Sequence, residues 1–226
     1  MAEHLRRGLG KHGQIAHVEQ MPRSRGASFA EDDLLHHLTN VMRSCLQSTS
    51  VTRLCAHRAQ TVCAAVAGKH IVVSTSTSSG KSLCYNVPLL ESIVSSPTSS
   101  ALYVFPTKAL EWDEGRAPPR RHCASILACH CQFQRILSGL THVIVDEART
   151  YHGAFSCHTT LVLRCLRHLC ADVYGRRPTF VFCTATLANL SEHVMELPGV
   201  DEVELVDQDA SPHGVKHFVH CNSSTA

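Results

Sequence analysis

Two short stretches of the sequence carry residue types that handle phosphates and divalent cations. The first is Gly80-Lys81-Ser82, which follows the β-branched run Ile71-Val72-Val73 and a polar Ser/Thr loop. A strand that ends in such a loop and turns into a helix leaves backbone N–H groups unpaired, and together with the helix dipole they form a phosphate cradle. The second is Asp146-Glu147, at the end of an apolar run. These two acids could hold Mg²⁺ and orient an attacking water, so the pair of stretches predicts nucleoside triphosphate chemistry.

The first stretch follows the P-loop pattern, in which the Lys reaches the β- and γ-phosphates and the Ser hydroxyl binds Mg²⁺. Thr75 stands where the pattern has its first Gly, so on this motif alone a Ser/Thr loop with a chance Gly-Lys-Ser remains an alternative. We predict that Lys81, Asp146 and Glu147 are catalytic. Ser82 and Asp146 would hold the metal, and Glu147 would act on the hydrolytic water. The loop residues expected at the nucleotide are Thr75, Ser76, Thr77, Ser78, Ser79, Gly80, Lys81 and Ser82.

Apolar strands alternate with helical stretches along most of the chain, which predicts an α/β fold with a parallel sheet and helices on both faces. In such sheets ligands bind outside the carboxyl ends of the strands, so Asp146 should lie beside the Lys81 loop. Pro88 should kink or interrupt the helix that follows that loop. The expected strands are 71–74, 101–105, 143–145, 180–183 and 203–206, and the expected helices are 28–41 with Ser28 as its cap, 58–67, 82–94 and 159–170.

Composition is that of an ordinary globular protein, with 226 residues, a net charge of +2 and a pI near 8.0. The N-terminus has no apolar signal region and no apolar run approaches membrane-spanning length, which predicts a cytosolic or nuclear setting. The twelve cysteines are then expected to be reduced, most of them as small buried hydrophobic residues. Residues 1–25 show no periodicity, and we expect a basic, poorly ordered lead-in there.

Two further motifs lie in register with the first two: Pro106-Thr107-Lys108-Ala109-Leu110 and Thr184-Ala185-Thr186. Taken in chain order, the four motifs resemble motifs I, Ia, II and III of the DEAD/DEAH-box helicases of superfamily 2. The wording between the motifs, such as KSLCYNVP, YVFPTKAL and TYHGAFSCH, is similar to the Hrq-type DNA repair helicases related to RecQ. The resemblance covers about Leu54 to the end of the chain.

The resemblance implies a three-layer αβα, P-loop NTPase fold, the first RecA-like domain of a two-domain motor that hydrolyses ATP with Mg²⁺. Its partner would be single-stranded nucleic acid, DNA in preference to RNA, and its setting the nucleus, with the cytoplasm as the alternative. Pro106, Thr107 and Lys108 would contact the strand's phosphates. Arg149, Thr184 and Thr186 would couple nucleotide state to the rest of the motor.

The chain departs from the family at several positions. Arg58 stands where the family has an adenine-reading Gln, and Arg can only donate hydrogen bonds, which predicts a weakened preference for ATP over GTP. Arg149 replaces the usual His. Roughly sixty residues of the family pattern are absent around the charged stretch 111–122, and no second RecA-like domain follows. We therefore expect little ATPase and no unwinding from this chain alone. The expected organisation is a basic segment 1–27, a helical lead-in 28–53, the ATP-binding domain 54–210 and a tail 211–226.

Two alternative functions remain at this stage, and two weaker signals are set aside. The chain could be a non-catalytic remnant that binds nucleotide or nucleic acid, a reading favoured by Arg149 and the lost segments. It could be an unrelated P-loop enzyme such as a small-molecule kinase, although that leaves two of the four motifs unexplained. Cys129-His130-Cys131 has one residue between its cysteines and no second pair, so its spacing disfavours structural zinc. The basic residues Arg164, Arg167 and His168 are expected to form a solvated helix face rather than a nucleic-acid stripe.

Overall fold

The computed structural model describes two compact units. The larger is formed by 29–209 and the smaller by 1–28 together with 210–226. The residues described are 13–21, 26–30, 38–49, 51, 53–76, 79–105, 127–151, 154–185, 190–212 and 216–223.

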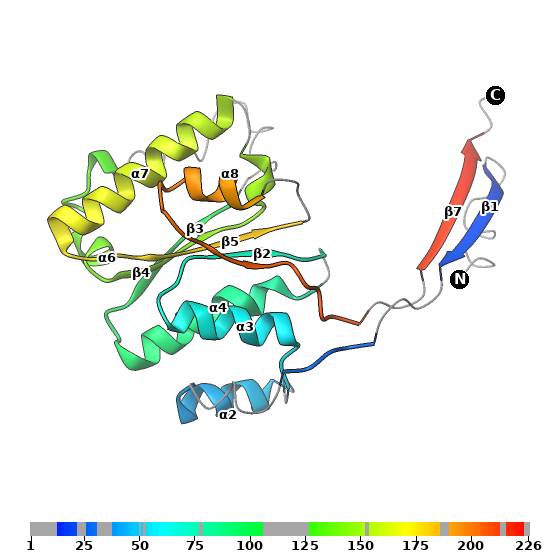
Figure 1. Cartoon of the computed structure of the whole chain (residues 1–226), viewed down its shortest axis with the longest axis horizontal. Coiled ribbons are helices and arrows are strands. Elements are labelled where there is room, and N and C mark those ends of the chain that lie inside the picture. The colour runs from blue at the N-terminus through cyan, green and yellow to red at the C-terminus, as the bar shows by residue number, and fades with distance from the viewer. Residues whose placement is uncertain are drawn as a thin grey trace. The chain divides into compact units, whose positions relative to one another are not determined.

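A five-stranded parallel sheet forms the centre of the larger unit, in the strand order β3-β4-β5-β2-β6 (Figure 1). Each strand is a short apolar run, and strands buried on both faces are typical of parallel sheets. All five predicted strands are confirmed: β2 has the predicted ends, and the other four differ by one to three residues at an end. The strands are β2 (Ile71–Ser74), β3 (Ser100–Val104), β4 (Leu140–Val145), β5 (Thr179–Thr184) and β6 (Glu204–Val206).

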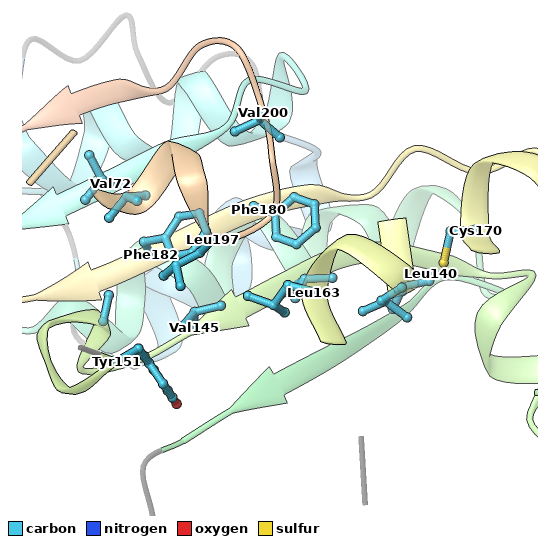
Figure 2. Packing of buried hydrophobic residues seen from close by; sticks show 14 of the residues in the cluster. Val72, Leu140, Val145, Tyr151, Leu163, Cys170, Phe180, Phe182, Leu197 and Val200 are labelled. Carbon is cyan, nitrogen blue, oxygen red and sulfur yellow. The ribbon is translucent and has the colours of Figure 1, made fainter. Parts of the chain in front are cut away.

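Successive side chains of the central strands pack against opposite helical layers. Val72 and Phe182 face a cluster with helices α7 (Ala154–Tyr174) and α8 (Leu190–Glu196) (Figure 2). Their neighbours Val73 and Cys183 face a second cluster with α3 (Ala56–Val66) and α4 (Lys81–Ser95). This alternation follows from the two-residue period of a strand. It confirms the predicted α/β architecture with a helical layer on each face of the sheet.

Helix α2 (Asn40–Ser48) packs on the outer side of α3 and α4 through Met42 and Leu46. Its N-cap is Thr39, whose hydroxyl accepts from the N–H of Met42, while the buried Glu91 carboxylate accepts from the N–H and hydroxyl of Thr39. The predicted cap at Ser28 is wrong, because the next residue, Phe29, forms an isolated antiparallel bridge with Cys55. The cap that forms is the one that gains a tertiary carboxylate partner.

Two other helices also differ from prediction. Helix α4 continues through Pro88 without interruption, and α7 extends beyond both ends of the predicted 159–170. A short helix, α6 (Gln134–Leu137), precedes β4 and adds Leu137 to the α7 side of the core. Predicted α3 is confirmed, and Gly68 follows its end in the left-handed conformation (φ 77°), as a helix-ending Gly does.

The smaller unit is a two-stranded antiparallel sheet of β1 (Gly13–Met21) and β7 (Lys216–Ser223). The predicted irregular lead-in is therefore wrong for Gly13–Met21. A strand whose partner lies about 200 residues away leaves no signal in local sequence periodicity. Within the part of the chain described here, no helix combines the length and apolar character needed to cross a membrane.

Candidate functional site

The carboxyl ends of β2, β5 and β4 meet at one edge of the sheet. In the parallel register, Ser74 of β2 lies beside Thr184 of β5, and Phe182 of β5 lies beside Val145 of β4. The Lys81 loop, Thr184 and Asp146 therefore leave the sheet at the same edge, where ligands of parallel α/β sheets bind. The structure confirms the predicted juxtaposition of the three motifs.

Lys81 joins two of these motifs directly. Its side chain is largely buried, and its Nζ donates to the carbonyl of Thr75 at 3.0 Å and to the carbonyl of Thr184 at 3.1 Å. An ammonium group has three donors, so the two carbonyls fix its position and leave one N–H for a ligand. The Thr184 contact also places the predicted coupling residue within reach of the loop.

Gly80 makes the turn into α4. It is the N-cap of that helix and adopts φ 74°, a conformation that costs other L-residues about 1–2 kcal/mol. A Cβ at this position would lie 2.5 Å from Nη2 of Arg58. The left-handed backbone therefore favours glycine here, and a larger residue would also make the Arg58 guanidinium shift.

The Arg58 guanidinium holds the loop from the α3 side. Its Nε and Nη2 donate to the carbonyl of Ser79 at 3.0 and 2.6 Å. Within the loop, the hydroxyls of Thr75 and Ser79 are hydrogen-bonded at 2.7 Å. Arg58 is thus placed at the loop, as the sequence predicts, through a backbone contact that the motif comparison did not anticipate.

Two residues of this site were not found from the sequence. Asp209, just after β6, accepts from the N–H and hydroxyl of Ser76 at 3.2 and 2.6 Å. His57 is buried beside Arg58; burial and the Arg58 charge lower the pKa of its imidazole, and the opposing effect of Asp209 is smaller. The only local signal for His57 is its position next to Arg58, and Asp209 has none because 133 residues separate it from Ser76.

The two acids lie at the tip of β4. The N–H of Asp146 donates to the carbonyl of Val104, and Oδ1 of Asp146 accepts from the N–H of Glu147 at 2.9 Å. Glu147 has φ 48° and is the one non-glycine residue of the described ranges with a positive φ. Such strained backbone is often found at functional sites. Its Oε2 forms an ion pair with Nε of Arg149 at 3.0 Å, in the 3₁₀ turn η3 (Ala148–Thr150).

Charged groups of the two motifs contribute to the pKa shifts of two neighbouring side chains. Burial raises the pKa of the Cys183 thiol well above its usual range, Asp146 and Glu147 raise it further, and Lys81 opposes them. Burial also raises the pKa of Tyr85, with Asp146 adding to the shift and a hydrogen bond with Ser82 opposing it. Ser82 and Asp146, the two predicted metal ligands, thus both influence the Tyr85 phenol.

Several predicted site residues lie outside the described residues. They include the segment expected to contact the nucleic-acid strand, part of the Lys81 loop and part of the Thr184-Ala185-Thr186 motif. The shortened stretch 111–122 also lies outside the described residues. These site residues are Thr77, Ser78, Pro106, Thr107, Lys108 and Thr186.

Comparison with known proteins gives a consistent family match. The DEAD/DEAH box helicase family model matches residues 56–116. Over 74% of its length the chain is 32% identical to the ATP-dependent helicase HRQ1 of Saccharomyces cerevisiae, and over 69% it is 34% identical to the uncharacterized ATP-dependent helicase YprA of Bacillus subtilis. It spans 19% and 26% of these two relatives.

Solved structures agree with the sequence relatives. The DUF1998 helicase MrfA, in its complex with DNA and AMPPNP, superposes with a TM-score of 0.78 and 28% identity, covering 97% of this chain and 35% of that one. The DEAD-box helicase Mss116 superposes with a TM-score of 0.60 at 13% identity, which supports the fold alone. The RecA-like fold expected from the motifs is thereby confirmed.

Proposed function

Since this chain belongs to the DEAD/DEAH box helicases and spans only a part of the length of its curated relatives, we propose that it is the ATP-binding domain of a nucleic-acid-dependent ATPase. In this proposal it binds ATP with Mg²⁺ and works on single-stranded nucleic acid, DNA in preference to RNA, in nuclear DNA repair or unwinding. The DNA-bound state of MrfA supports the choice of partner. The expected strand contacts are Pro106, Thr107 and Lys108.

The observation that carries the proposal is the double contact of Lys81 with Thr75 and Thr184. One ammonium group spans the loop after β2 and the end of β5. A ligand that takes hydrogen bonds from Lys81 therefore changes contacts in both motifs at once. This is the arrangement a motor needs to report the presence of a γ-phosphate to a second motif.

The residues around Lys81 fit a metal–triphosphate complex. Ser82, in the first turn of α4, and Asp146, at the tip of β4, supply the hydroxyl and carboxylate oxygens that Mg²⁺ prefers, and both act on Tyr85. A bound Mg²⁺ would neutralise charge on the phosphates. Lys81 would bind phosphate oxygen, the loop amides would cradle it, and Glu147 would accept a proton from the attacking water.

The test of this function is nucleotide binding by Lys81→Ala. We expect a loss of at least tenfold in affinity for Mg²⁺–AMPPNP, measured by isothermal titration calorimetry, because a charge-assisted phosphate contact is removed. Lys69→Ala is the matched control, since Lys69 is exposed and pairs only with Glu204 among the described residues. Equal affinity in wild type and Lys81→Ala would refute the proposal.

A second candidate function, a non-catalytic nucleotide binder, is favoured by the Glu147–Arg149 ion pair. A permanent cation lies 3.0 Å from Oε2 of the predicted base and competes with water for that oxygen, which accepts no hydrogen bond within the described part of the chain. Both functions predict nucleotide binding, and only turnover separates them. A single-turnover assay with Mg²⁺–ATP and single-stranded DNA distinguishes them: slow phosphate release that Glu147→Gln abolishes supports the ATPase, and no release above that of Glu147→Gln supports the binder.

A further inference from the structure

Asp209 is placed to act on Lys81 through one peptide group. The N–H of Ser76, which donates to Asp209, and the carbonyl of Thr75, which accepts from Lys81, belong to the same planar peptide unit. Fixing one end of that unit fixes the direction of the other. The Ser76 hydroxyl adds a second hydrogen bond of 2.6 Å to the same carboxylate oxygen.

We propose that Asp209 is a positioning residue that pre-orients Lys81 for nucleotide by holding the Thr75–Ser76 peptide. The inference rests on the proposed function of the loop. It adds to that loop a supporting residue, Asp209, that lies outside the four motifs. Asp209 comes from the segment that leaves β6, the edge strand next to β2. The nucleotide loop is therefore tied to the part of the chain that continues beyond the sheet.

The groups facing Asp209 suit a residue that holds the loop in place rather than one that blocks Lys81. His57 and Arg58, both on α3, interact with the Ser79 backbone on the other side of the same loop, and Asp209 acts on the His57 imidazole. The carboxylate thus lies among donors at the start of the loop. Lys81 keeps an N–H that neither Thr75 nor Thr184 uses.

The direct test compares Asp209→Ala with Asp209→Asn in the whole chain. An Asn keeps an oxygen acceptor for the Ser76 N–H and hydroxyl, whereas Ala removes it. We expect Asp209→Ala to weaken Mg²⁺–AMPPNP binding by about tenfold and Asp209→Asn by less than threefold. Asp207→Ala is the charge control, because Asp207 is exposed two residues away and should bind like wild type.

Coupling to Lys81 separates positioning from general destabilisation. In a double-mutant cycle with Lys81→Arg, which keeps the charge and changes the donor geometry, the Asp209→Ala loss should shrink to less than threefold. Hydrogen exchange without nucleotide gives an independent readout. The amide of Ser76 should exchange at least tenfold faster in Asp209→Ala and stay protected in Asp209→Asn.

Several results would overturn the proposal: unchanged or tighter binding by Asp209→Ala, equal losses in Asp209→Ala and Asp207→Ala, or full additivity with Lys81→Arg. If wild type binds no nucleotide, the proposed function fails. The exchange experiment then decides alone whether Asp209 holds the peptide, and an unchanged Ser76 rate rejects it.

Discussion

At the scale of single residues, the binding and hydrolytic groups of the site are held in different ways. Two backbone carbonyls accept hydrogen bonds from Lys81 and fix its position. They leave one of its three N–H groups for a ligand. Glu147 is held by the Arg149 side chain, which carries a permanent charge. The lysine is therefore ready to bind phosphate, whereas one oxygen of the predicted base lies against a cation that competes with water for it.

Replacing Arg149 by His should raise ATP turnover. Both partners of the ion pair are partly exposed, so the pair is worth about 0.2–1 kcal/mol and its loss should raise kcat by about 1.4- to fivefold. Affinity for Mg²⁺–AMPPNP should change by less than twofold. A steady-state phosphate-release assay measures this, with Glu147→Gln as the inactive control. A fall in kcat for Arg149→His would show that the arginine assists the reaction.

Arg58 should reduce discrimination between adenine and guanine. Nε and Nη2 of Arg58 donate to the Ser79 carbonyl, and an Arg has no acceptor for the N6 amine of adenine, whereas a Gln can both donate to N7 and accept from that amine. We expect ADP and GDP affinities within about tenfold of each other in wild type. Arg58→Gln should shift the ratio toward ADP, as calorimetry with both nucleotides would reveal. A strong ADP preference in wild type contradicts this view of Arg58.

The sequence predicted the residues that define motifs but not those that support them. Lys81 was identified from the P-loop pattern and Thr184 from the resemblance to motif III, and the meeting of strand ends at one edge of a parallel sheet predicted that Asp146 lies beside them. Asp209 was missed because nothing near residue 209 indicates a contact with Ser76 across 133 residues. The Glu147–Arg149 ion pair was not predicted from the sequence either.

At the scale of elements, the turn into α4 depends on the fit between Gly80 and Arg58. Gly80→Ala should lower the free energy of unfolding by about 1–2 kcal/mol for the left-handed backbone, and further for the clash with Arg58. In an Arg58→Ala background only the backbone cost should remain. Urea unfolding of the two single variants and the double variant measures the difference. Equal costs in both backgrounds would argue against the close contact.

The same scale shows which elements the sequence determines locally. The five apolar runs gave the strands of the sheet, since each is buried on both faces and needs no special partner. Helix α2 was misplaced because its cap, Thr39, is favoured by Glu91, which lies 52 residues away. Strands β1 and β7 were missed for the same reason, as each finds its hydrogen bonds only in the other.

At the scale of the whole molecule, buried histidines should make the fold sensitive to acid. Burial lowers the pKa of His142 to about 4 from the ordinary 6.5, and burial likewise lowers the pKa of His70 and His57. Between these values the unfolded chain binds more protons than the folded one, so stability must fall as the pH drops from 6.5 toward 4. His142 alone accounts for up to about 3 kcal/mol of this loss.

Urea unfolding at pH 7.0, 5.5 and 4.5 checks this dependence. His142→Leu should flatten the fall in stability, whereas His168→Asn should not, because His168 is exposed on α7. If His142→Leu loses stability with acid as steeply as wild type, the imidazole is not the group that titrates.

The most direct test of the whole account is the Mg²⁺ dependence of AMPPNP binding in wild type and Asp146→Asn. If Lys81 and Asp146 share one metal–triphosphate complex, Mg²⁺ should tighten binding at least tenfold in wild type and hardly at all in Asp146→Asn. Lys81→Ala should weaken binding with or without the metal. An Asp146→Asn chain that gains as much affinity from Mg²⁺ as wild type would contradict a shared site.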